Sequence, residues 1–304
     1  MVSTTASAST PRTRSRLRRR NTLAGWSFIL PNFIGFAALT LVPVVASLAL
    51  AFMKWNSYST PEWVGLDNFR RLVDSENFWT ALYNTTYYAV GHVPLTLVAA
   101  LGFAVLLNRK LRGVRFFRTA LFFPYITSLV AVAVVWNMLF SPDAGPVNQF
   151  LRAVGVDSPP GWTTSTTWAM PALIITSVWR DMGYYMVLYL AGLQTIPGEL
   201  YEAAKMDGAS PWQRFWHITL PSLRPTTFFV LIMLTISSFK VFDLVQVMTE
   251  GGPGRSTLVL SQLIFREGIE QGRFGYSSAI AMVLFVIVLL ITVVQFRLQQ
   301  RKER

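Results

Sequence analysis

The sequence predicts an all-α protein that crosses a lipid bilayer six times. Of the 304 residues, 52% are hydrophobic and only 14% are charged, which departs from soluble proteins toward membrane proteins. Six apolar runs also reach the roughly 20 residues that a helix needs to cross the hydrocarbon core. No segment between these runs is long enough for a soluble domain of useful size, so we expect a single integral membrane domain.

Short polar segments separate the six predicted spans. The spans are Leu23–Phe52, Ala81–Leu107, Phe116–Phe140, Trp168–Leu193, Thr226–Val247 and Tyr276–Val294. Several contain proline, which membrane helices tolerate with a kink. The first run is too long for the apolar core of a secretory signal, although Ala49-Leu50-Ala51 has the form of a cleavage site. We therefore expect a basic tail (residues 1–22), a transmembrane domain (residues 23–298) and a C-terminal tail (residues 299–304).

The distribution of basic residues predicts the orientation of the chain. Basic residues favour the cytoplasmic side of a membrane. With the N-terminus inside, eighteen lysines and arginines fall in cytoplasmic segments and seven fall outside. This places both termini and the loop of residues 197–225 in the cytosol of a multi-pass plasma-membrane protein. The pI near 10.4 then reflects topology and contact with anionic lipids, and no base-reading motif suggests nucleic acid.

The chain lacks the residues for catalysis of its own. It has no cysteine, which excludes disulfides and thiolate chemistry, and we predict no metal site. A Walker A motif needs a lysine after glycine so that the loop can hold phosphates, and no lysine here follows a glycine. We therefore expect no cofactor and no enzymatic activity in this chain, with ATP and magnesium bound by a partner subunit.

Residues 201–225 form a polar island that predicts two short helices joined by a tight turn. Pro197 can open the first helix, and Gly208 after Asp207 can end it, because glycine tolerates the left-handed conformation at a helix C-terminus. Ser210, followed by Pro211 and Gln213, has the form of a capping box at the start of the second helix. Pro221 predicts the end of that helix at or before Leu220.

This loop resembles the signature loop of the inner-membrane permeases of binding-protein-dependent ABC importers, in their maltose-type carbohydrate branch. The matching positions are Glu202, Ala203, Ala204, Asp207, Gly208, Ala209, Phe215, Ile218, Leu220 and Pro221. The resemblance implies a type I ABC importer permease fold and a loop that docks on a cytosolic ATPase. A helix lying at the lipid interface is the alternative for such an amphipathic segment.

The resemblance also implies partners. A second permease subunit, in a heterodimer, a dimer of cytosolic ATPases and an extracytoplasmic substrate-binding protein would complete the transporter. The segment Gly251-Gly252-Pro253-Gly254 resembles a position at which relatives face the binding protein, although an ordinary tight loop fits it equally well.

Charged residues inside predicted spans point to a site, because charges in the hydrocarbon region usually face a cavity or a partner. Arg180 and Asp181 lie in the fourth span, and Lys240 and Asp243 lie in the fifth. Lys240 and Asp243 are three residues apart and are expected to pair on one helix face. Arg180 and Asp181 are adjacent, so one of them is expected to reach across to the fifth span. An ion pair that only stabilises helix packing is the alternative.

The resemblance to maltose-type permeases implies a substrate pathway about halfway across the membrane. The residues that correspond are Tyr125, Ser177, Trp179, Arg180, Asp181, Ser238 and Val241, and we add Lys240 for its charge. Hydroxyl groups and an aromatic face suit a sugar. Relatives carry neutral residues where this chain has Arg180 and Asp181, so the choice between a sugar and a phosphorylated polyol stays open.

The sequence therefore predicts a permease subunit of an ATP-driven ABC importer for sugars or sugar-like solutes, which forms half of the translocation pathway. An ion-coupled secondary transporter is the alternative. It predicts an inverted internal repeat with paired broken helices, and no second copy of the pattern at residues 179–193 is present. An intramembrane enzyme would need a nucleophile and base or a metal set within the spans, and His92 with His217 does not form one.

Overall fold

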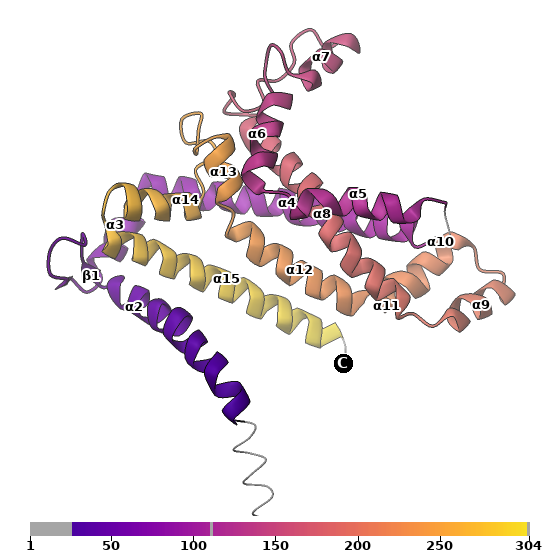
Figure 1. Cartoon of the computed structure of the whole chain (residues 1–304), viewed down its shortest axis with the longest axis horizontal. Helices are drawn as coiled ribbons and strands as arrows, with labels where there is room; N and C mark the ends of the chain where they lie inside the picture. Colours follow the sequence, from indigo (N-terminus) through magenta and orange to yellow (C-terminus); the bar gives the residue numbers. More distant parts are fainter. Residues whose placement is uncertain (1–25, 110–111, 303–304) are drawn as a thin grey trace, which may run out of the picture. The chain divides into compact units, whose positions relative to one another are not determined.

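The structure is a computed structural model that describes residues 26–109 and 112–302 (Figure 1). The described residues are mostly helical with almost no strands, which confirms the predicted all-α class. Their only strands, β1 (Met53–Lys54) and β2 (Glu62–Trp63), form one short antiparallel ladder. The chain divides into a unit of residues 1–50 and a unit of residues 51–304, which we describe separately. The predicted basic tail at residues 1–22 lies outside the described residues.

The first unit contributes one apolar helix, Trp26–Leu50. It includes a π-helical turn, η1 (Ala37–Leu41), followed by α2 (Val42–Leu50). None of its residues is buried. A helix that is apolar on every face needs lipid or another protein around it.

The second unit is a bundle of long helices with short helices at its ends (Figure 1). Its helices are α3 (Asp67–Val73), α4 (Glu76–Leu107), α5 (Val114–Ile126), α6 (Leu129–Leu139), α7 (Pro146–Ala153), α8 (Ala169–Gln194), α9 (Gly198–Met206), α10 (Pro211–Arg214), η2 (Phe215–Thr219), α11 (Leu220–Ser222), α12 (Arg224–Phe239), α13 (Asp243–Met248), α14 (Leu260–Phe265), η3 (Arg266–Glu270) and α15 (Phe274–Lys302). The predicted C-terminal tail, residues 299–304, is therefore helical up to Lys302.

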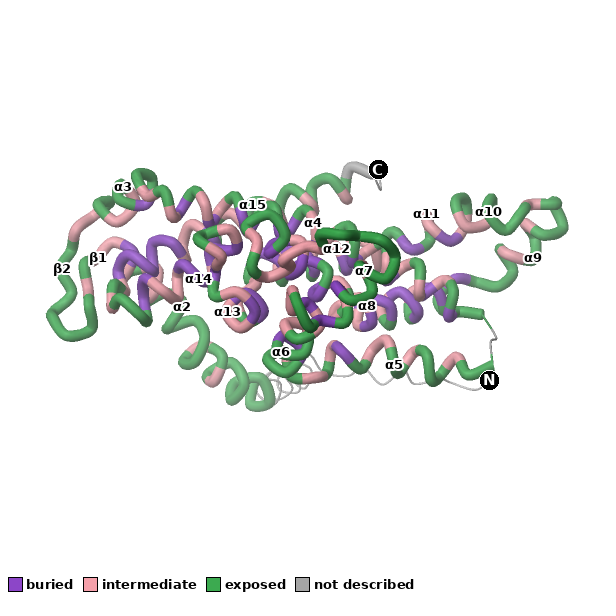
Figure 2. Tube along the Cα trace, turned by 90° about the horizontal axis from the view of Figure 1, so that it is seen from above, coloured by how far each residue is buried: buried purple, intermediate pink, exposed green. Residues whose placement is uncertain are grey.

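Helices α4 and α8 form the centre of this unit. They pack along each other, α5 and α12 contact both of them, and α15 lies beside α12. Figure 2 shows that most buried residues follow α4, α8 and the segments α13 and α14. Small residues on these helices, such as Ala100, Ala104 and Ala172, are completely buried and allow the close approach.

Three described helices are long and apolar enough to cross a membrane: Trp26–Leu50, Glu76–Leu107 and Phe274–Gln300. The number rises to five if two bent pairs each count as one span. Helix α8 has 26 residues but is not among these candidates, and its polar centre at Arg180 and Asp181 lowers its apolar character. The count of six spans therefore stays a prediction.

Two predicted spans are broken. The run Phe116–Phe140 divides into α5 and α6, which meet at 101° around Thr127 and Ser128. The run Thr226–Val247 divides into α12 and α13, because residues 240–242 leave the helical conformation. Lys240 and Asp243 therefore do not share a helix face, and no ion pair joins them in the described structure. The prediction that they pair was wrong.

Pro221 does not end its helix, contrary to the prediction. The helical backbone continues through α11 to Ser222 and bends by 65° before α12 begins at Arg224. A proline lacks an N–H group and its ring clashes with the carbonyl four residues earlier. Just before Pro221, η2 uses the wider π-helical pattern, in which the Leu220 N–H donates to the Phe215 carbonyl. This wider turn moves the carbonyl aside, so the helix can pass the proline.

Candidate functional site

Arg180 and Asp181 form an ion pair with each other at the middle of α8. Arg180 Nη1 lies 2.7 Å from Asp181 Oδ1, and both side chains are largely buried, at 19% and 15% exposed. No ion pair in the described structure joins either residue to the expected partners, Lys240 and Asp243. The long Arg180 side chain folds back onto its neighbour, so the predicted partner on the fifth span was wrong.

The residue that reaches Asp181 from another helix is His92 on α4. Its Nε2 lies 3.3 Å from Asp181 Oδ2, and its Nδ1 shares a hydrogen bond of 2.9 Å with Ser238 Oγ on α12. From the sequence, His92 could line a path or only fill a packing position, and it is not among the predicted pathway residues. A polar residue in an apolar span was the available signal.

A hydrogen bond between α4 and α8 lies one turn away. The Tyr88 hydroxyl donates to Ser177 Oγ at 2.7 Å, and both residues are buried. The Tyr88 ring also stacks on the His92 imidazole, with 5.3 Å between the ring centroids. Ser177, a predicted pathway residue, therefore belongs to the same polar cluster as Asp181 and Ser238.

An aromatic wall stands beside Arg180. Tyr125 on α5 stacks on Tyr184 with 4.3 Å between centroids, and the Arg180 guanidinium carbon lies 5.1 Å from the centre of the Tyr125 ring. Such a position is favourable for a cation. Trp179, by contrast, packs edge-on against Trp136 rather than joining the cluster.

Part of this cluster lines a cavity of about 160 Å³. Of the predicted pathway residues, Ser177, Arg180, Asp181, Lys240 and Val241 line it, and Asp243 lines it as well. Tyr125, Trp179 and Ser238 are not among its lining residues. Two cations and two anions therefore face one small space. Its volume is below the roughly 300 Å³ at which ligand pockets usually begin.

The predicted helix-turn-helix at residues 197–225 is present, apart from the predicted end of its second helix before Pro221. Pro197 precedes α9, and Gly208 follows it with φ of 77°. The Ala209 N–H donates to the Ala204 carbonyl at 2.8 Å, as in a glycine-terminated helix end. The Ser210 side chain accepts from the Gln213 N–H, and the Gln213 side chain accepts from the Ser210 N–H. The capping box is therefore confirmed.

The residues of the predicted coupling surface divide into two groups. Glu202, Ala203, Asp207 and Gly208 are exposed, and all other members are partly buried. Ile218 packs against the core cluster of α4, α8 and α12. The first group is therefore accessible from outside the chain, whereas Ile218 attaches the loop to the bundle. A hydrogen bond of 2.9 Å between the Tyr201 and Thr219 hydroxyls joins the two arms.

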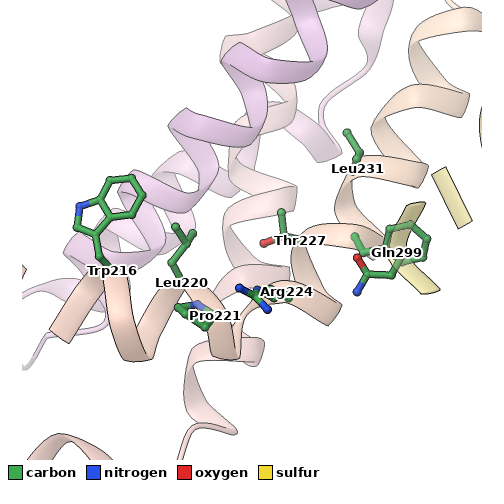
Figure 3. Close-up of a pocket in the computed structure, with 8 residues that line it drawn as sticks. Trp216, Leu220, Pro221, Arg224, Thr227, Leu231 and Gln299 are labelled. Carbon is green, nitrogen blue, oxygen red and sulfur yellow. The ribbon is translucent and has the colours of Figure 1, made fainter. Parts of the chain in front are cut away.

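A groove of about 700 Å³ lies where this loop continues into α12. Figure 3 shows Trp216, Leu220 and Pro221 on the loop side and Thr227 and Leu231 along α12, with Gln299 of α15 opposite. Arg224 stands at the bend between the two segments. The loop and α12 therefore leave a groove between them at the bend.

The outer segment around the Gly251–Gly254 turn is anchored to α4. The Asn84 amide donates to the Arg255 and Leu258 carbonyls at 2.9 and 3.0 Å, and the Leu260 N–H donates to the Thr85 hydroxyl. Arg255 pairs with Glu76 at 3.0 Å. This segment is thus a fixed part of the second unit rather than a loose loop.

Comparison with known proteins gives a consistent result. A family model described as "binding-protein-dependent transport system inner membrane component" matches residues 92–304. The probable ABC transporter permease protein YesP of Bacillus subtilis (strain 168) is 42% identical over 288 residues, which cover 93% of each chain. The lactose transport system permease protein LacF of Rhizobium radiobacter is 38% identical over 288 residues, covering 93% of this chain and 96% of LacF.

A solved structure agrees with the fold. A chain of a bacterial alginate ABC transporter, in complex with an alginate pentasaccharide-bound periplasmic protein, matches with a TM-score of 0.82 and 27% identity. The match covers 93% of this chain and 96% of that chain.

Proposed function

The chain belongs to the family of inner-membrane permease components of binding-protein-dependent transport systems. From this premise, we propose that it carries sugars through a site at the cavity between α4, α8 and α12. The observation that carries the proposal is the cavity itself, in which hydroxyls, balanced charges and a nearby tyrosine face converge inside an apolar bundle. Such groups suit the hydroxyls and the C–H face of a sugar ring.

The charges of the cavity favour a neutral sugar over a phosphorylated polyol. Arg180 is already paired with Asp181, and Lys240 lines the cavity together with Asp243. Two cations are thus matched by two anions, so the site offers no net positive charge to a phosphate. Relatives named for lactose and for trehalose and maltose transport support the same substrate class.

We propose that the loop of residues 197–225 couples transport to ATP hydrolysis. The exposed residues Glu202, Asp207 and Gly208 lie on its outer arm, and the second arm is attached to the bundle through Ile218. An ATPase that grips the outer arm can therefore move α12, which ends at the cavity. Alternating access requires that the loaded binding protein favours the outward-open state, since a ligand with equal affinity for both states shifts nothing.

The assembly that follows is a heterodimer of permeases with two cytosolic ATPases and an extracytoplasmic binding protein. One chain lines only a small cavity, and a second permease would complete it. The excess of basic residues places the loop and both termini in the cytosol.

Purification of the tagged chain from its own membrane tests the proposal. We expect an ATPase and a second permease chain to copurify, and we expect the complex in vesicles, with a binding protein, to take up labelled lactose or maltose only with ATP. Uptake without ATP that is abolished by an ionophore would instead indicate an ion-coupled transporter.

A further inference from the structure

We propose that His92 is a positioning residue for the sugar site, which holds Asp181 on α8 and Ser238 on α12 in the orientation in which they meet the solute. The inference rests on the proposed function, and it concerns a residue outside the set that the family resemblance indicates. Its basis is the contact of one imidazole with two of the predicted pathway residues at once.

Each of the two ring nitrogens of His92 faces a residue of a different helix. Nε2 lies 3.3 Å from Asp181 Oδ2, and Nδ1 lies 2.9 Å from Ser238 Oγ. The Ser238 hydroxyl donates to the Leu234 carbonyl at 2.7 Å, one turn earlier on α12. A hydroxyl has one O–H, so the Ser238 oxygen accepts from the Nδ1–H of His92. Nε2 faces the Asp181 carboxylate as a close polar contact rather than as a hydrogen bond.

Asp181 is held at both of its oxygens. Oδ1 lies 2.7 Å from Arg180 Nη1, and Oδ2 lies next to His92. The first contact comes from the adjacent residue on α8 and cannot fix α8 relative to another helix. The contact with His92 does so, because His92 belongs to α4.

His92 itself offers almost no surface to a solute. It is 1% exposed, and its ring stacks on Tyr88, whose hydroxyl donates to Ser177. A buried polar ring without partners would be costly. The imidazole thus acts through Asp181 and Ser238 rather than by contact with the sugar.

Three substitutions of His92 test its contact with Asp181 and its contact with Ser238 separately. The amide of His92→Gln extends to about the position of Nε2 and can still reach Asp181. The shorter amide of His92→Asn reaches only about the position of Nδ1 and can still bond Ser238. His92→Leu loses both contacts while keeping an apolar side chain of similar size.

The readouts are uptake of labelled lactose and labelled maltose by the whole complex in vesicles, together with the yield of assembled complex. We expect His92→Gln to keep the wild-type KM and the wild-type preference between the two sugars. We expect His92→Asn and His92→Leu to raise KM by about tenfold and to change the preference, because Asp181 then loses its polar contact with α4, and a polar contact to a charged group is worth about 1.5–3 kcal/mol. Assembly is expected to persist.

Thr96→Val is the matched control. Thr96 lies one turn further along α4, is completely buried, and its hydroxyl has no hydrogen-bond partner among the described residues. Replacing it by valine keeps the shape and should leave KM and sugar preference unchanged.

A cysteine at Ser237 gives a readout that does not depend on the sugar, because the chain has no native cysteine. Ser237 lines the cavity on α12. We expect His92→Leu to speed its alkylation by a maleimide several-fold, and His92→Asn to leave the rate unchanged.

Wild-type KM, preference and alkylation rate in all three variants would overturn the inference. Equal loss of assembly in all three, including His92→Gln, would assign His92 to helix packing alone. Neither result bears on the proposed function, which is tested by ATP-dependent uptake in the wild-type complex.

Discussion

Gly183 on α8 lies directly against the backbone carbonyl of Leu121 on α5, so that a Cβ atom at position 183 would occupy the space of that carbonyl. The contact is between backbones and cannot be relieved by turning a side chain. It brings α5 close enough for Tyr125 to stack on Tyr184, the residue after Gly183. The aromatic wall beside Arg180 thus depends on a glycine.

Gly183→Ala is therefore expected to separate α5 from α8. Overpacking of this kind typically costs about 1–3 kcal/mol. We expect a lower thermal stability of the purified complex and weaker uptake. Gly102→Ala on α4 is the control, since nothing lies within 4 Å of a Cβ at that position. Equal stability of the two variants would contradict the close contact.

Gly208→Val tests the coupling loop. The space around Gly208 is open, so the effect should come only from its φ of 77°. A side chain at a left-handed position costs about 1–2 kcal/mol. We expect the variant to insert in the membrane but to lose uptake and the stimulation of ATP hydrolysis by the loaded binding protein.

Gly198→Ala provides the comparison, because Gly198 has open space and no positive φ. It should behave as wild type. Glu202→Ala, which removes an exposed carboxylate from the proposed docking surface, should reduce stimulated ATP hydrolysis. Normal uptake and hydrolysis in both Gly208→Val and Glu202→Ala would show that this loop is not the coupling element.

Asp181→Ala should leave Arg180 and His92 without their shared carboxylate. Removing one partner of a largely buried ion pair is expected to cost about 3–5 kcal/mol. The double variant Arg180→Gln with Asp181→Asn removes both charges and should recover assembly. If the pair lines the sugar site, the double variant assembles but has altered sugar preference, measured by uptake. Wild-type preference in the assembled double variant would assign the pair to packing.

Cysteine labelling tests the orientation. A cysteine at Lys205, in the coupling loop, should react with an impermeant maleimide only from the cytosol. A cysteine at Thr60, which is exposed in the segment between the first two long helices, should react only from outside. Reaction of both sites from the same side would refute the predicted topology.

Local signals predicted the coupling loop well. Pro197, Gly208 and the Ser210 capping box each act within a few residues, so their effects can be read without knowledge of the tertiary structure. The family resemblance indicated Ser177, and charge within the fourth span indicated Arg180 and Asp181; all three line one cavity.

The contacts between helices could not be predicted in the same way. The breaks at Thr127 and at residues 240–242 fall inside runs that are apolar enough on average to be predicted as single spans, and the charge of Lys240 suggested a site rather than a bend. His92 becomes part of the site only because α4 packs against both α8 and α12. The continuation of the helix past Pro221 depends on a π-helical turn that no residue pattern announced.

That turn makes the loop sensitive to its length. A π-helical turn uses one more residue for each hydrogen-bonded ring than an α-helix does, so the segment Phe215–Thr219 in effect contains one inserted residue. Deleting a single residue there would restore the α-helical pattern and leave the two arms in nearly the same register. It would also bring the Pro221 ring against the carbonyl four residues before it, so the helix is expected to end or kink at this proline, although every side chain outside the deletion was kept. Chains of this kind should therefore tolerate substitution within this turn far better than insertion or deletion.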